Sequence, residues 1–251
     1  MNATKFTLAK APIVEAVVDI DCDMPATFDL AGIEVLARDA FRSHYPTLGM
    51  AFVEHHHFMA AEEQPPVHSA QRAVQAFQFR SADKKQLVQV RSQGFSFNRL
   101  TPYANLEEYL PEIERAWRIF LGLALPVNIR AIRLRYINRI FLPLKMGEVQ
   151  LDDFLKIAPR LPDELKLTFA GFLNQHAAVE GPTGHRVNIV LASELGDGKW
   201  LPVIFDNTVE ARGPSGPDDW EWILGKIEAL RELKNRVFRE ALTDKCLDLF
   251  R

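Results

Sequence analysis

The feature that most constrains the fold of this chain is the order of its strand-like and helix-like segments, which is similar in its two halves. Residues 13–20 are rich in β-branched side chains that partly alternate with polar ones, a pattern typical of a strand with one covered face. Apolar residues then recur at helical spacing over 29–45, and Pro46 ends the run. The other segments predicted for this half are strands at 50–60, 72–80 and 86–99, with a bend or break at Gly94, and a helix from about Asn105.

The second half follows the same order. Its predicted segments are a long strand at 127–142, helical pieces within 151–166 broken by Pro159 and Pro162, strands at 169–179, 185–195 and 201–210, and a helix from about Asp218. Asn105 with Glu108, and Asp218 with Glu221, have the spacing of a capping box at a helix start. Pro111 indicates that the first of these helices either kinks at that point or properly begins there.

This repeated order predicts an α+β protein in which residues 1–125 and 126–251 form two similar halves, each with a strand, a helix, antiparallel strands and a helix. If each half places its long helix on the same side of its strands, the result is one compact unit with a curved sheet and helices on one face. Such an architecture is analogous, at the level of fold alone, to TATA-binding-protein-like and helix-grip folds.

Composition narrows the class of protein. Of the 251 residues, 47% are hydrophobic and 25% are charged, which is enough apolar side chain for a core. The net charge of −3 gives no overall attraction to nucleic acid or to an anionic membrane. Residues 1–12 lack the apolar stretch of a secretory signal, and no apolar run approaches the roughly 18 residues of a membrane span. We therefore expect a cytoplasmic protein with no membrane partner, in which Cys22 and Cys246 form no disulfide framework.

The strongest candidate for ligand binding is a row of arginines on the strand predicted at 127–142. Alternation along a strand sends Arg133, Arg135 and Arg139 to one face, and we call these three residues the arginine row. Guanidinium groups grip carboxylates and phosphates at two points, so this face would hold an anionic ligand or partner, with Asn138 beside it. The alternative is that acids of neighbouring strands neutralise the row. Glu180, Glu194 and Asp206 are the candidates for that role.

Polar side chains also gather on the strands predicted in the first half. Arg91 and Arg99 extend the set of candidate ligand-binding residues, and Asn98 lies between them. Phe95 and Phe97 are close by in sequence, and a polar strand face with aromatic side chains can bind single-stranded nucleic acid or a peptide. The simpler alternative is a face that contacts only water, as antiparallel sheets commonly have.

A histidine cluster is the only hint of a metal site. On a strand, His55 and His57 would share one face and could both bind a divalent metal, but no third ligand is visible. The chain contains no glycine-rich phosphate loop, nucleophile elbow or paired-cysteine motif. The sequence therefore predicts no cofactor and identifies no catalytic residue.

Three stretches resemble a sporadically distributed bacterial protein family of unassigned function. They are Leu8 to Ala16 (LAKAPIVEA), Leu134 to Ile140 (LRYINRI), and Leu233 to Phe238 with Leu242 to Leu247 (LKNRVF and LTDKCL). Because they span nearly the whole chain, the resemblance implies one complete unit. It carries over no activity, cofactor or catalytic residue.

The sequence favours a non-catalytic binding protein that holds an anionic ligand or a protein partner on its sheet. One alternative is an enzyme with a scattered site, either metal-assisted through His55 and His57 or handling phosphate near Arg135. Another is a regulatory nucleic-acid-binding protein, whose affinity would fall steeply with salt. A homodimer would follow from pairing of open sheet edges.

Overall fold

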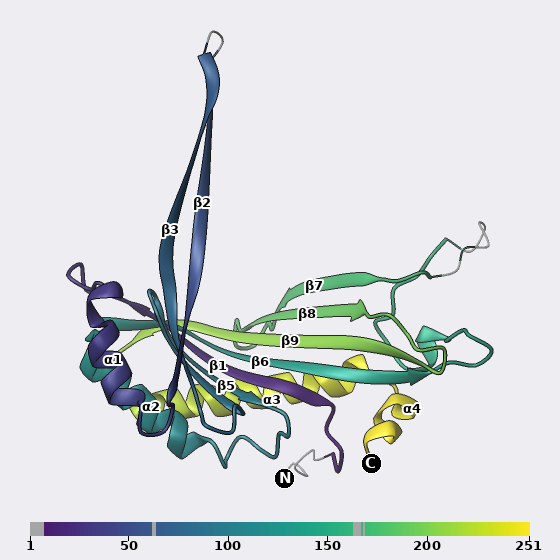
Figure 1. The fold of residues 1–251 in the computed structure, drawn as a ribbon. Coiled ribbons are helices and arrows are strands. Elements are labelled where there is room, and N and C mark those ends of the chain that lie inside the picture. The colour runs from purple at the N-terminus through teal and green to yellow at the C-terminus, as the bar shows by residue number, and fades with distance from the viewer. Residues whose placement is uncertain (1–7, 62–63, 163–166, 168) are drawn as a thin grey trace.

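The protein is an α+β fold built on one nine-stranded sheet (Figure 1). The computed structural model describes residues 8–61, 64–162, 167 and 169–251, and the side chains at 55–61, 64–69 and 71 lie outside this description. The strands are β1 (Ile13–Asp23), β2 (Thr47–Ala61), β3 (Gln64–Arg80), β4 (Gln86–Arg91), β5 (Gly94–Leu100), β6 (Asn128–Pro143), β7 (Leu173–Val179), β8 (Arg186–Ser193) and β9 (Trp200–Ser215). They lie in the order β2-β3-β4-β5-β1-β6-β9-β8-β7, and every neighbouring pair is antiparallel.

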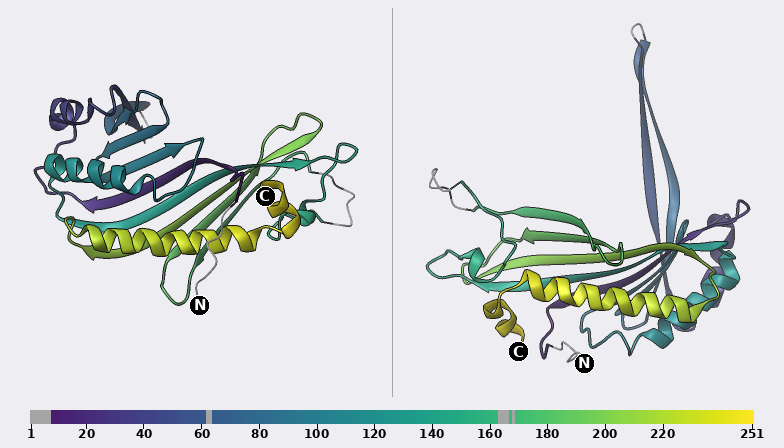
Figure 2. Two further views of the ribbon diagram at one scale, coloured as in Figure 1. Left: turned by 90° about the horizontal axis from the view of Figure 1, so that it is seen from below. Right: turned by 180° about the vertical axis from the view of Figure 1, so that it is seen from behind.

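The described part of the chain contains four α-helices and several short 3₁₀ turns. The helices are α1 (Glu34–Phe41), α2 (Leu110–Ala124), α3 (Trp220–Ala241) and α4 (Asp244–Leu247). Seen from below, α2 and α3 lie across the same side of the sheet (Figure 2). The sheet therefore has a helix face and a face that no described helix covers.

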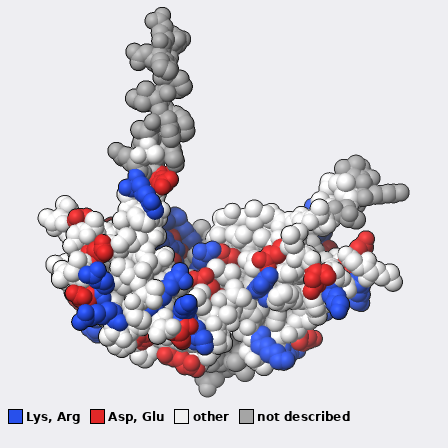
Figure 3. All heavy atoms as spheres, viewed as in Figure 1, with Lys and Arg blue, Asp and Glu red and all other residues white. Residues whose placement is uncertain are grey.

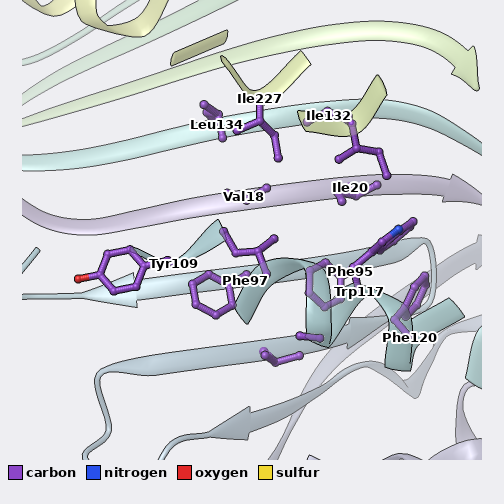
Figure 4. Close-up of a cluster of buried hydrophobic side chains, with 14 of the residues drawn as sticks. Val18, Ile20, Phe95, Phe97, Tyr109, Trp117, Phe120, Ile132, Leu134 and Ile227 are labelled. Carbon is purple, nitrogen blue, oxygen red and sulfur yellow. The ribbon is translucent and has the colours of Figure 1, made fainter. Parts of the chain in front are cut away.

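Strict alternation along the strands produces these two faces. Val18 and Ile20 of β1, and Ile132 and Leu134 of β6, point to the helix face and are at most 3% exposed. Their neighbours at odd positions, such as Asp19 and Arg133, point to the other face. Trp117 and Phe120 of α2, Ile227 of α3 and Phe95 of β5 complete the core between the layers (Figure 4). Burial of these large side chains is the main source of the fold's stability.

The predicted helix starts are partly confirmed. Pro111 lies in the first turn of α2, so the helix begins there and does not kink. The amide of Asn105 accepts a hydrogen bond from the backbone N–H of Glu108 at 3.1 Å, but this contact closes a turn before the helix. Asp219, not Asp218, caps α3 by accepting from the backbone N–H of Trp222.

The break predicted at Gly94 is confirmed. The segment expected at 86–99 is divided into β4 and β5 just before Gly94, which has a φ of 141°. A Cβ atom at Gly94 would lie 2.1 Å from the carbonyl oxygen of Ile20, so only glycine fits where β5 meets β1. The helical pieces expected within 151–166 are reduced, among the described residues, to a 3₁₀ turn at Leu151–Asp153.

The strands β2 and β3 extend beyond the sheet as a long two-stranded ribbon, which we call the arm (residues 52–61 and 64–74). Only the base of β3, Ala76–Arg80, pairs with β4, whereas β2 and β3 pair with each other from Thr47 to Ala61. The arm rises from the sheet on the side away from α3 (Figures 1 and 2). It therefore stands beside the uncovered face.

The segment that precedes β1 packs against the end of the chain. The backbone N–H of Lys10 donates to the carbonyl oxygen of Phe250 at 2.9 Å. Cys22 and Cys246 are both buried and free. Among the described residues, no helix has the length and apolar character needed to cross a membrane.

Candidate functional site

The uncovered face of the sheet carries a connected set of charged side chains. Arg133 donates to Asp21 at 2.6 Å and to Glu210 at 3.2 Å, and its Nε lies 3.9 Å from Asp19. Arg91 donates to the other carboxylate oxygen of Asp21 at 2.9 Å. These five residues, which we call the central ion-pair network, link β4, β1, β6 and β9 across the sheet.

The central ion-pair network is ordered although it faces away from the core. The side chain of Asp21 is 10% exposed and that of Glu210 is 11% exposed, so their charges need the arginines beside them. Burial alone would lower the pKa of Arg133, but the charges of Asp21 and Asp19 outweigh it and raise that pKa. The guanidinium of Arg133 therefore stays charged and fixed between carboxylates from two neighbouring strands.

The rest of the arginine row is neutralised in the same way. Arg135 binds Asp206 with two nitrogens, at 3.0 Å from Nε to Oδ1 and 2.6 Å from Nη2 to Oδ2. Arg139 donates to Glu194 at 2.6 Å. Of the acids considered from the sequence, Asp206 and Glu194 pair with the row, whereas Glu180 pairs with Arg236 of α3. A space-filling view also shows the two signs of charge intermingled (Figure 3). The expected strongly cationic face is therefore close to neutral.

A chain of amides runs parallel to the central ion-pair network. Gln78 donates to Gln89 and Gln89 donates to Asn98, each at 3.1 Å, and Asn98 donates to Glu15 at 2.6 Å. These residues lie on β3, β4, β5 and β1 and share the uncovered face. The aromatic side chains considered with them are elsewhere, because Phe95 is fully buried under α2.

The structure does not bring all the candidate ligand-binding residues together. Arg91, Arg133, Arg135 and Arg139 share the uncovered face. Asn138 points to the helix face, is 3% exposed and donates to the carbonyl oxygens of Tyr136 and Phe205. Arg99 also lies on the helix side, with its guanidinium 4.7 Å from the ring centre of Tyr109. In the alternation along its own strand, each of these two residues points to the helix face, which places it away from the arginine row.

The metal hypothesis falls largely outside the described residues. The backbone of His55 and His57 belongs to β2 in the arm, but their side chains lie outside the described part of the structure. Among the side chains that the structure does describe, no group of three or more His, Cys, Asp or Glu residues is arranged to hold a metal ion.

A second site, on the helix face, was not predicted from the sequence. A cavity of about 130 Å³ lies between β6, α3, the loop before α2 and the segment that begins at Leu8. Lys234 of α3 lines it and is 9% exposed, with its ammonium nitrogen 3.7 Å from the ring centre of Tyr136. The hydroxyl of Tyr136 is 2.9 Å from that of Tyr103, and Arg231 lies at the same cavity. We call this cavity the Lys234 pocket.

Lys234 stands out because its charge has no counter-ion in the described structure. Burial, and secondly the positive charge of Arg231, lower the pKa of Lys234 from 10.5 to about 7. Arg231 itself is paired with Glu107 at 3.0 Å. The sequence did contain a signal for this site, because Lys234 lies seven residues after Ile227 and four before Phe238, within the apolar stripe of α3.

A larger hollow of about 970 Å³ lies among the loops that join β6 to β7 and β8 to β9. The charged side chains in its described lining, Glu148, Asp152 and Arg160, are all exposed. It therefore lacks a buried polar group that would fix the orientation of a ligand.

Comparison of the chain with protein-family models, with curated proteins and with solved structures finds no match. The candidate sites consequently rest on geometry and chemistry alone, and the resemblance to a sporadically distributed bacterial family stays a prediction.

Proposed function

We propose that this protein is a non-catalytic binding protein that holds another protein on the uncovered face of its sheet. The observation that carries the proposal is the central ion-pair network, which orders charged side chains across four strands on the face that no described helix covers. A face that only meets water has no need for such order, because exposed ion pairs contribute little to stability.

The charges on this face favour a protein partner that carries both signs of charge. A polyanion approaching Arg133 would meet Asp19, Asp21 and Glu210 at the same time. A protein surface with alternating charges can complement the network without breaking its pairs. With nine strands about 4.8 Å apart and a length of roughly seven residues per strand, the face offers roughly 900 Å². That is close to the ~800 Å² that each partner buries in a standard interface.

The arm supports an interaction role. Beyond the sheet, its strands pair only with each other, and an isolated two-stranded ribbon is marginally stable in water. Phe52 near its base is 41% exposed, and the guanidinium of Arg72 lies 3.7 Å from its ring centre. A partner bound to the uncovered face would also contact the arm, which rises beside that face, and would add to the stability of the arm.

The proposal includes a duplicated architecture, analogous to TATA-binding-protein-like folds. In each half the first strand pairs with the last one, β1 with β5 and β6 with β9, and β1 and β6 meet at the centre of the sheet. Each half ends in a long helix, α2 or α3, on the same face. This correspondence supports two copies of one structural unit.

Site-specific photocrosslinking in the native host tests the proposal. Benzoylphenylalanine replaces Thr208, which lies on the uncovered face between Arg135 and Asn188, or Ala229, which is exposed on the outer side of α3. We expect a discrete protein adduct from position 208 and none of the same mass from position 229. The adduct should be lost in an Arg135→Ala, Arg139→Ala variant, because both arginines are about half exposed and contribute to the same face.

Other crosslinking outcomes would contradict the proposal. Adducts that are identical at positions 208 and 229, or that persist unchanged in the double variant, would eliminate the uncovered face as the binding surface. Adducts to nucleic acid, with affinity that falls steeply with salt, would favour the nucleic-acid alternative. A small anionic ligand on the arginine row, a homodimer through the edge strands β2 and β7, and a cytoplasmic location stay predictions.

A further inference from the structure

We propose that the Lys234 pocket binds a small organic carboxylate, with Lys234 and Arg231 as its cationic partners. This site is on the opposite side of the sheet from the proposed protein-binding face and does not depend on it.

The polar end of the pocket is set up for an anion. Lys234 is the most buried charged group there, and none of the described residues accepts a hydrogen bond from its ammonium nitrogen. Arg231 adds a second cation with 22% of its side chain exposed. Glu107, the carboxylate paired with Arg231, is 41% exposed and lies at the rim. A metal ion or an amine would be repelled by these two cations, whereas a carboxylate would supply the missing counter-charge.

The tyrosine pair adds hydrogen-bonding capacity next to Lys234. Tyr103 and Tyr136 share one hydrogen bond between their hydroxyls at 2.9 Å, so one of the two hydroxyl protons remains to be donated. Burial raises the pKa of both hydroxyls, that of Tyr136 to about 12, so both stay protonated. A protonated phenol beside an ammonium group suits a carboxylate oxygen.

The pocket is small, and one side of it is apolar, although Asn105, Asn138 and Asn235 also belong to its lining. Leu8, Pro12, Ile13 and Phe238 line it on the side of the N-terminal segment and the end of α3. Its volume of about 130 Å³ is similar to that of an apolar cavity of ~150 Å³ that accepts benzene. The shape and lining therefore favour a monocarboxylate with a short hydrocarbon tail over inorganic phosphate, which has no apolar part.

Titration calorimetry on the full chain, with acetate, butyrate and inorganic phosphate as probes and butyramide as the neutral control, tests this inference. We expect butyrate to bind more tightly than acetate, and butyramide and phosphate to give no saturable heat. Lys234→Met should weaken butyrate binding at least about tenfold, the equivalent of one strong charged contact. Lys226→Met is the matched control, since Lys226 lies over Trp222 on the same helix but outside the pocket.

Proton linkage separates a ligand contact from a merely structural lysine. Binding of a carboxylate to Lys234 requires the ammonium form of the lysine, so the protein should take up as much as about one proton when butyrate binds near pH 8. Calorimetry in two buffers of different ionisation enthalpy measures this uptake. Butyrate should also slow the acetylation of Lys234, followed by peptide mass spectrometry. Absence of saturable butyrate binding, or binding that Lys234→Met leaves unchanged, would refute the inference. So would equal affinity for butyramide or phosphate.

Discussion

Replacing Lys234 with methionine should make the folded protein more stable, and the gain should depend on pH. Methionine fills nearly the same space as lysine in the Lys234 pocket but carries no charge to desolvate. The side chain lies over the Tyr136 ring and is 9% exposed, so methionine keeps the apolar contacts of the lysine stem.

The magnitude follows from the pKa. Lys234 has a pKa of about 7 in the folded protein and 10.5 as the ordinary value. Below pH 7 both states are protonated, and a shift of this size corresponds to a destabilisation of about 4 to 5 kcal/mol by the buried charge. Between pH 7 and 10.5 the unfolded chain binds more protons than the folded one, so the native protein gains stability as the pH rises. At about pH 9 the remaining destabilisation is about 2 kcal/mol.

Urea unfolding of both proteins at about pH 6 and about pH 9 measures the effect. We expect the free energy of unfolding of Lys234→Met to exceed that of the native protein by about 4 to 5 kcal/mol at the lower pH and by about 2 kcal/mol at the higher pH. The difference between the two pH values, about 2 to 3 kcal/mol, is the more reliable quantity because it cancels the packing change of the substitution. Lys226→Met, outside the pocket, should show no such pH dependence.

A variant that is less stable than the native protein at both pH values, or one whose advantage is the same at both, would refute this reasoning. An equal advantage at both pH values would mean that Lys234 is charged and compensated in the folded state. The absence of a counter-ion among the described residues would then be misleading, and the carboxylate inference would lose its main support.

The contacts of the sheet predict how further substitutions change the stability of the protein. Arg133→Met should destabilise the protein by about 2 to 4 kcal/mol in urea unfolding, because Asp21 keeps Arg91 but loses Arg133, and Glu210 also loses its contact with Arg133. A second change, Asp21→Asn, should recover part of the loss, and strict additivity of the two changes would contradict a shared network. Gly94→Ala should destabilise by at least about 3 kcal/mol, since its Cβ would clash with backbone, whereas Gly225→Ala in open space on α3 should stabilise by about 0.5 to 1 kcal/mol. Equal melting temperatures for the two alanine variants would show that Gly94 is not required by the close approach of β1.

The general plan of the fold could be predicted from the sequence because each element has a strong local signal. The alternation in β1 and β6 and the helical stripe of α3 locate their elements in any context. The arm could not be predicted at its full length, because β2 and β3 extend well past the sheet and nothing in local propensity reports how far two strands stay paired. The break between β4 and β5 was predicted at Gly94, but its cause, the close approach of β1, is a tertiary contact that only the structure shows.

The candidate binding residues were predicted only in part. Alternation correctly placed Arg133, Arg135 and Arg139 on one face. Their neutralisation depends on register, because Asp206 and Glu210 come from β9, which is distant in sequence and pairs with β6. A one-residue shift in that pairing would have turned both acids to the helix face and left the row cationic. The register between strands that are distant in sequence cannot be predicted from local sequence, so the net charge of the uncovered face became known only from the structure.

The two sites differ in what their chemistry requires. In the central ion-pair network every charge has an oppositely charged partner among the described residues, so the network needs no further charge and serves as a preformed surface. Lys234 is the reverse case, a costly buried group with no acceptor among the described residues. Such a group persists only where it brings something besides stability, because substitution by an apolar residue is easily reached and stabilising. A completed network therefore indicates a surface for a large partner, whereas an uncompensated charge in a small cavity indicates a small ligand that completes it.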